Sequence, residues 1–188
     1  MDCIVDNVGA VRVLLLHAHP LEDSYSAALR DRAVEALDGD DHDVTVVRLG
    51  AGDDAGPDSD ELTDISALVL VYPTWWGSQP APLLGWIQRV IGPWIDERGR
   101  QLEESPLGSV EKLIVITTHG SSRWINGLQG EPGRHLLKRS VLPLCAPGVE
   151  FRWISLYKLD LLEPSDLVAF IDRVGRELTG LTSAGASA

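Results

Sequence analysis

Residues 67–90 read ALVLVYPTWWGSQPAPLLGWIQRV, and they contain a strand-then-helix pattern that recurs along the chain. Ala67 to Tyr72 is an unbroken apolar run rich in branched residues, which is typical of a strand buried on both faces of a parallel sheet. Pro73 ends this run. Pro80 opens a second pattern whose apolar residues recur at helical spacing: Leu83, Leu84, Ile87, Val90 and Ile91. We therefore expect a buried strand, a short loop and a helix with one buried face.

The loop between this strand and this helix carries paired indoles, in the sequence Pro73-Thr74-Trp75-Trp76-Gly77-Ser78. The carboxyl end of a buried strand is where an open α/β sheet binds ligands, and flat aromatic surface suits a planar one. Tryptophans in a loop can equally plug a core or a subunit interface. From this loop alone, both interpretations stay open.

Length and charge limit the classes of protein to be considered. The chain has 188 residues, which suits one domain with its own core, and a formal net charge of -12. Because nucleic acids and anionic membranes are bound by clustered Lys and Arg, neither is expected as a partner. Much of the acidic charge lies in residues 38–43 and 53–61, which we expect to be loops. Cys3 and Cys145 are far apart and lack metal-ligand neighbours, so no disulfide and no metal site is predicted.

The ends of the chain show no targeting pattern. Residues 1–10 are polar and acidic, without the basic start and apolar centre of a signal peptide, and no apolar stretch is long enough to span a bilayer. We expect a soluble, cytoplasmic protein without membrane insertion. Residues 1–188 are predicted to form a single domain, with disordered ends at 1–9 and 181–188.

Four further apolar runs predict strands at residues 11–16, 44–49, 113–118 and 151–156. The second of these alternates in polarity, which favours the edge of a sheet. Helices are predicted after Ser26, from Pro132 and from Pro164, with Gly39, Pro143 and Gly180 as their stops. Polar connections are predicted at residues 50–60, 93–104 and 124–133, the first of them followed by a short helical turn near 60–64.

The exit of the first strand carries His19 and then Ser24-Tyr25-Ser26 at a helix start. Backbone N–H groups at a helix start are unpaired and lie at the positive end of the helix dipole, so hydroxyls there suit a phosphate. Ser24 can instead be an ordinary helix N-cap, and His19 can be satisfied by nearby backbone. The turn lacks both Gly-x-Gly-x-x-Gly and the Gly-Lys-Ser/Thr ending of a P-loop, so neither a typical dinucleotide fold nor an NTPase is indicated.

A third polar exit follows the strand at 113–118, in the sequence Thr117-Thr118-His119-Gly120-Ser121-Ser122. Alternating strands and helices predict a parallel sheet covered on both faces, and five strands with the first one central give the order 2-1-3-4-5. In that order the exits of the first, third and fourth strands are neighbours. Hydroxyls, indoles and a Thr/Gly loop in one crevice match the phosphate, the flat ring and the polar ring edge of a flavin.

The combination of motifs resembles one known family, the flavodoxin-like NAD(P)H:quinone oxidoreductases. This family includes quinone reductases, modulators of drug activity and ancillary subunits of potassium efflux systems. The similarity extends from residue 11 to about residue 157 and rests on Ala18-His19-Pro20, Ser24-Tyr25-Ser26, Pro73 to Trp76, Pro80-Ala81, Gly85-Trp86, Arg89-Val90, Thr117-Thr118 and Gly120. It implies a flavodoxin-like three-layer fold and a homodimer that takes a hydride from NADH or NADPH onto bound FMN or FAD. Two electrons then pass to a quinone or similar acceptor, a reaction that needs no catalytic side-chain nucleophile.

The resemblance assigns a role to each matched position. The flavin tail would contact His19, Ser24, Tyr25 and Ser26. The isoalloxazine ring would lie against Pro73, Thr74, Trp75, Trp76 and Gly77. The ring edge would contact Thr117, Thr118, His119 and Gly120.

The sequence departs from the family at several of these positions. Ser26 stands where many members have Asn, Leu84 where many have Lys, and His119 where many have Gly. Trp124 and Gln129 stand near the positions of the Tyr and His that relay protons in mammalian-type members. We expect both to line the nicotinamide or acceptor pocket.

Other interpretations remain beside the oxidoreductase. The chain could be a regulatory subunit that docks on a membrane transporter. A hydrolase is disfavoured because no Gly-x-Ser-x-Gly nucleophile elbow is present. Arg123 and Arg134 are candidates for the phosphate of the donor, with an ordinary surface position as the alternative.

Overall fold

The computed structural model describes residues 11–38, 42–50, 56–95 and 105–181. Five strands form one parallel sheet: β1 Arg12–Ala18, β2 Asp43–Leu49, β3 Ala67–Thr74, β4 Lys112–His119 and β5 Glu150–Leu156. The order across the sheet is β2-β1-β3-β4-β5, which confirms the predicted order and the edge position of β2.

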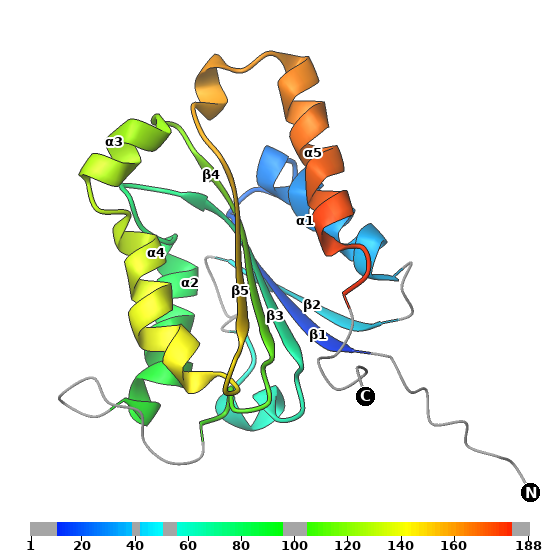
Figure 1. The fold of residues 1–188 in the computed structure, drawn as a ribbon, viewed down its shortest axis with the longest axis vertical. Coiled ribbons are helices and arrows are strands. Elements are labelled where there is room, and N and C mark those ends of the chain that lie inside the picture. The colour runs from blue at the N-terminus through cyan, green and yellow to red at the C-terminus, as the bar shows by residue number, and fades with distance from the viewer. Residues whose placement is uncertain (1–10, 39–41, 51–55, 96–104, 182–188) are drawn as a thin grey trace, which may run out of the picture.

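Helices cover both faces of this sheet, so the fold has three layers (Figure 1). On one face lie α1 Tyr25–Asp38 and α5 Pro164–Leu178. On the other lie α2 Ala81–Trp86 and α4 Pro132–Leu136, while α3 Arg123–Leu128 caps the end of the sheet where β4 terminates. Two π-helical segments, η2 Ile87–Ile91 and η4 Leu137–Val141, continue α2 and α4. The other short helical segments are η1 Ser59–Leu62, η3 Gly92–Trp94, η5 Leu142–Leu144 and η6 Leu159–Leu161.

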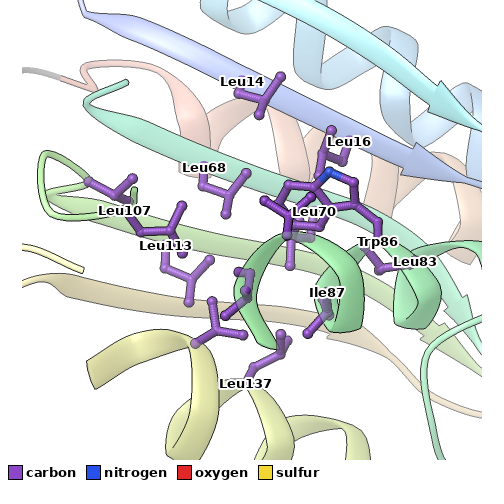
Figure 2. Packing of buried hydrophobic residues seen from close by; sticks show 14 of the residues in the cluster. Leu14, Leu16, Leu68, Leu70, Leu83, Trp86, Ile87, Leu107, Leu113 and Leu137 are labelled. Carbon is purple, nitrogen blue, oxygen red and sulfur yellow. The ribbon is translucent and has the colours of Figure 1, made fainter. Parts of the chain in front are cut away.

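The core divides into two clusters because successive strand side chains point to opposite faces. Val13 and Leu15 of β1 pack under α1 and α5, whereas Leu14 and Leu16 pack under α2 and α4. Figure 2 shows the second cluster, in which Trp86 lies across the leucines of β1 and β3. Each face of the sheet therefore has its own apolar layer, as unbroken apolar strands require.

The strands run further toward the functional end of the sheet than predicted. β3 continues through Pro73 to Thr74, although Pro73 was expected to end it. The pairing of β3 with β1 stops at Val71, while its pairing with β4 continues to Thr74. A proline is tolerated there because no neighbour on the β1 side needs its missing N–H.

The predicted loop at residues 124–133 is wrong in its first half, where the structure has helix α3. Ser122 begins this helix, since its side chain accepts a hydrogen bond of 3.3 Å from the backbone N–H of Ile125. Pro132 starts α4 as predicted. Pro143 lies inside the last turn, η5, rather than after it, because a proline can occupy the first positions of a helical turn.

The predicted ends and acidic loops are only partly within the described residues. Leu181 was assigned to the disordered tail, but it is 1% exposed and belongs to the core under α1 and α5. Asp38 ends α1 and Asp43 begins β2, so these two acidic residues are not loop residues. Gly39, residues 1–9 and 182–188, and parts of the predicted connections at 50–60 and 93–104 lie outside the described residues. Among the described helices, none has the length and apolarity needed to cross a membrane.

Candidate functional site

A cavity of about 650 Å³ lies at the carboxyl ends of β3 and β4. Its wall contains the residues predicted for the ring and the ring edge, with the exception of Thr117: Pro73, Thr74, Trp75, Trp76, Gly77, Thr118, His119 and Gly120. The indole loop and the Thr/Gly loop therefore meet in space, as the strand order predicted. A volume of this size is that of a pocket for a small organic cofactor.

The indole loop is a tight turn that presents its side chains outward. Trp75 and Ser78 exchange two backbone hydrogen bonds of 3.0 and 2.9 Å. The two residues between them, Trp76 and Gly77, have φ angles of 52° and 79°, the combination found in type I′ turns. Trp76 is fully exposed and Trp75 is 41% exposed. Neither indole lies in the core of this chain, so the interpretation that the two tryptophans plug the core is excluded. The interpretation that they lie in a subunit interface stays open.

This turn is fixed to the elements around it. The backbone oxygen of Gly77 accepts a hydrogen bond of 3.1 Å from the N–H of Gly133 at the start of α4. The Gln79 side chain, which is buried, donates a hydrogen bond of 2.8 Å to the Gly133 carbonyl oxygen. Thr74 and Thr117 share a hydroxyl hydrogen bond of 2.8 Å between β3 and β4. The cavity wall is thus preorganised by contacts within the chain.

His119 places a neutral imidazole in this wall. The amide nitrogen of Asn126 donates to the Ser121 hydroxyl at 2.8 Å and to the Ser122 carbonyl at 2.9 Å, so the amide oxygen faces the Nδ1 of His119, 3.0 Å away. The proton of the imidazole therefore lies on Nδ1. Burial lowers the pKa of His119, and its ring stacks on Tyr157 with centroids 4.5 Å apart.

The other nitrogen of His119, Nε2, is buried and has no hydrogen-bond partner among the described residues. Because buried polar atoms in proteins are nearly always paired, an unpaired acceptor in a cavity wall indicates a partner that binds there. An N–H at the polar edge of a planar ring is such a partner. The residues present therefore fit a flavin.

The predicted phosphate residues lie outside this cavity. Ser24 is the N-cap of α1, because its hydroxyl accepts a hydrogen bond of 3.1 Å from the N–H of Ala27. His19 contacts the backbone of Leu21 through Nδ1 at 3.1 Å, so local backbone satisfies it. Both residues thus make the local contacts that the simpler interpretation requires, and their contact with a phosphate stays a prediction. The ring of His19 nevertheless lies 5.8 Å from that of Trp75, which places the loop between β1 and α1 beside the cavity.

Tyr25 and Ser26 make contacts within the fold. The Tyr25 hydroxyl donates a hydrogen bond of 2.8 Å to the Leu167 carbonyl oxygen of α5. Ser26 is buried and contacts His17, a residue that the sequence analysis did not single out. The sequence feature that could have drawn attention to His17 is its position as a polar residue at the end of an apolar strand.

Two residues were predicted for the acceptor pocket, and the structure brings one of them into the cavity. Gln129 lines it, whereas Trp124 lies on α3 and is 75% exposed. Trp124 and Leu128 lie one helical turn apart on α3, and Leu128 is 76% exposed. Arg134 binds Glu131 at 3.0 Å and lies over the ring of Trp153, so it has a structural position.

Five residues of the cavity wall were missed: Ser121, Asn126, Pro132, Leu159 and Asp160. Leu159 and Asp160 come from the turn η6 that follows β5. Since β5 is the neighbour of β4, its exit was the signal that could have predicted them.

Comparison with known families agrees with this geometry. A model of the family described as flavodoxin-like fold matches residues 11–146. The chain therefore belongs to the flavodoxin-like family. No curated protein sequence matches the chain.

Many solved structures share the fold, among them the following three. The Streptococcus mutans protein Smu.1420 has 18% identity and a TM-score of 0.76, over 91% of this chain and 100% of its own. An NAD(P)H:quinone oxidoreductase from Methanothermobacter marburgensis has 22% identity and a TM-score of 0.66, over 89% and 94%. An FMN-dependent NADH-azoreductase from Bacillus anthracis, in complex with FMN, has 15% identity and a TM-score of 0.67, over 89% and 97%. At these identities the similarity establishes the fold.

Proposed function

We propose that this protein is a flavin-dependent NAD(P)H oxidoreductase that passes two electrons to a quinone or similar acceptor. The single observation that carries the proposal is the cavity in which the indole loop faces Thr118, His119 and Gly120. A planar aromatic wall beside polar groups, one of them an unpaired acceptor, suits a flavin ring. The names of the structural relatives, a quinone oxidoreductase and an FMN-dependent azoreductase, support the same class.

In this proposal the residues of the chain bind and orient, and the flavin supplies the capacity to accept and release a hydride. Trp75 and Gly77 would hold the flat ring, while Thr118, His119 and Gly120 would hold its polar edge. Either FMN or FAD satisfies these contacts, and NADH or NADPH would be the donor. Donor and acceptor would then bind in turn against the open side of the ring. Such an enzyme would act in the cytoplasm, where both donors are present.

We also propose a homodimer. Trp76, Trp124 and Leu128 are large exposed apolar side chains that a second copy would cover. The same side chains favour the alternative function of a regulatory subunit that docks on a membrane transporter. The two proposals differ in solution: a free dimer with rapid turnover favours the enzyme, whereas a monomer that turns over only in the presence of a membrane partner favours the subunit.

The test of the proposed function is turnover. The protein is reconstituted with FMN or with FAD, and oxidation of NADPH and NADH is followed by absorbance with and without a benzoquinone. We expect donor oxidation that depends on both flavin and quinone. Equal rates with and without the protein would contradict the proposal.

Trp124→Ala is expected to raise the KM for the acceptor about threefold to tenfold, with kcat changed less. The reason is that an indole stacked on an acceptor ring contributes about 0.5–1.5 kcal/mol beyond the area it buries. The matched control is Val168→Ala, which truncates an exposed residue of α5 on the other face of the sheet. If both variants keep the KM of the parent protein, Trp124 does not contact the acceptor.

A further inference from the structure

A buried polar cluster lies beneath the first turn of α1. His17 is the penultimate residue of β1 and is fully buried on the face that α1 and α5 cover. Ser26 and Arg30 lie one helical turn apart on α1, so both reach the same histidine. The Ser26 hydroxyl is 3.2 Å from Nε2 of His17, and Nη1 of Arg30 is 3.5 Å from its Nδ1.

The direction of each hydrogen bond follows from the chemistry of these groups. A guanidinium can only donate, so Nδ1 of His17 accepts from Arg30. Burial lowers the pKa of His17 to about 4, with further contributions from Arg30, His19 and Arg48, so at neutral pH the ring carries one proton. That proton lies on Nε2 and is donated to the Ser26 oxygen.

The hydroxyl hydrogen of Ser26 is consequently left to donate elsewhere. Ser26 is 5% exposed, and within the described part of the chain its side chain has no partner besides His17. It belongs to the first turn of a helix of 14 residues, where Ser24 caps the N–H of Ala27 and the N–H groups of Tyr25 and Ser26 have no partner among the described residues. An anion at the start of α1 is the partner that this hydroxyl and these N–H groups fit.

The charges around this turn favour an anion as well. Arg30, Arg48 and His19 all act on His17 as positive or potentially positive neighbours, in a chain whose net charge is -12. Arg30 is paired with Asp31, and Arg48 is paired with Glu22. Asp31 and Glu22 neutralise part of the positive charge of the two arginines. The direction in which the Ser26 hydroxyl donates is set by His17 and does not depend on either carboxylate.

We propose that Arg30 and His17 are positioning residues that turn the Ser26 hydroxyl outward as a donor to a phosphate group bound at the start of α1. This inference rests on the proposed function, because the phosphate is that of the flavin. The ring of His19 lies 6.3 Å from that of His17, which contacts Ser26, and 5.8 Å from that of Trp75 in the cavity wall. One ligand can therefore reach from the cavity to the first turn of α1.

The experiment compares the binding of FMN with that of riboflavin, which has the same ring and no phosphate, to the flavin-free protein by calorimetry. We expect the parent protein to prefer FMN. Ser26→Ala and His17→Leu should each weaken FMN binding about tenfold to a hundredfold, as expected for the loss of a hydrogen bond to a charged group, and should leave riboflavin binding unchanged. The variant that combines Ser26→Ala and His17→Leu should bind FMN no more weakly than either single variant, because both substitutions act on the same hydrogen bond to the phosphate.

His17→Gln is the conservative variant, since its amide can accept from Arg30 and donate to Ser26. We expect it to restore most of the FMN preference. Arg30→Met should reduce the preference without altering a strand residue, which keeps the test valid if His17→Leu folds poorly.

Two outcomes distinguish a failure of the positioning role from a failure of the proposed function. If the parent protein prefers FMN but the Ser26, His17 and Arg30 variants keep that preference, or lose FMN and riboflavin affinity equally, the positioning role is wrong while the proposed function stands. If the parent protein binds neither ligand, both are wrong.

Discussion

Trp86→Ala is expected to lower the free energy of unfolding by about 3–5 kcal/mol, the range for removing a large buried aromatic side chain. Trp86 is 1% exposed and lies in the core between α2 and the leucines of β1 and β3 (Figure 2). Its Nε1 also donates a hydrogen bond of 2.9 Å to the Pro57 carbonyl oxygen. The substitution thus removes core packing and releases the segment that precedes β3.

Urea unfolding followed by circular dichroism measures this loss. The control is Trp76→Ala, which deletes the same side chain at a fully exposed position and should change the free energy of unfolding by no more than about 0.5 kcal/mol. Similar losses in the two variants would show that Trp86 is not a core residue.

A second large effect is expected on the pH dependence of stability. The pKa of His17 falls from 6.5 to about 4 on folding, because burial and the positive neighbours Arg30, His19 and Arg48 disfavour its charged form, while Asp31 opposes them. Between these two pH values the unfolded chain binds a proton that the folded chain does not. The stability from neutral His17 is therefore fully present above pH 6.5 and is lost as the pH falls toward 4, by about 3 kcal/mol in total.

His17→Gln removes the titrating group and should remove this part of the pH dependence. The free energy of unfolding is measured for both proteins between about pH 7.5 and 5, above the range in which most carboxylates titrate. His119, whose pKa is also lowered, titrates in both proteins and cancels in the difference. A difference that does not vary with pH would mean that His17 is not held neutral by the fold.

The sheet could be predicted from the sequence because its central strands, β1, β3 and β4, are apolar on both faces. The runs at 67–72 and 113–118 have no polar break, and in a chain of alternating strands and helices this pattern indicates the central strands of a covered parallel sheet. Strand order then placed the exits of β3 and β4 side by side, and the cavity between the indole loop and Thr118 follows from that order.

The parts that could not be predicted depend on tertiary contacts. Helix α3 is short and lies over the end of the sheet, where Ser122 and Asn126 fix it, so its sequence resembles that of a loop. His17 occupies a strand position that is normally apolar, and only the structure shows Ser26 and Arg30 above it. Leu159 and Asp160 are different, because they follow β5, the neighbour of β4, and the strand order alone could have predicted that this exit reaches the cavity.

Residues that match a phosphate-binding motif can be present for structural reasons alone. Ser24 caps α1, and Tyr25 ties α1 to α5, so both have reasons to be present without a ligand. Ser26 differs because its hydrogen has no acceptor within the described part of the chain. His119 differs in the same way through its unpaired Nε2. Unsatisfied polar atoms, rather than the motif itself, are what indicate a bound group.

The most direct test of the central claim, that this cavity binds a flavin, is the visible absorbance spectrum of the purified protein before and after anaerobic addition of NADPH and then NADH. We predict the yellow absorbance of a bound flavin, present on purification or after addition of FMN or FAD, which one of the donors bleaches and a quinone restores. A colourless protein that takes up neither FMN nor FAD would contradict the account, and the indole turn would then be a docking surface.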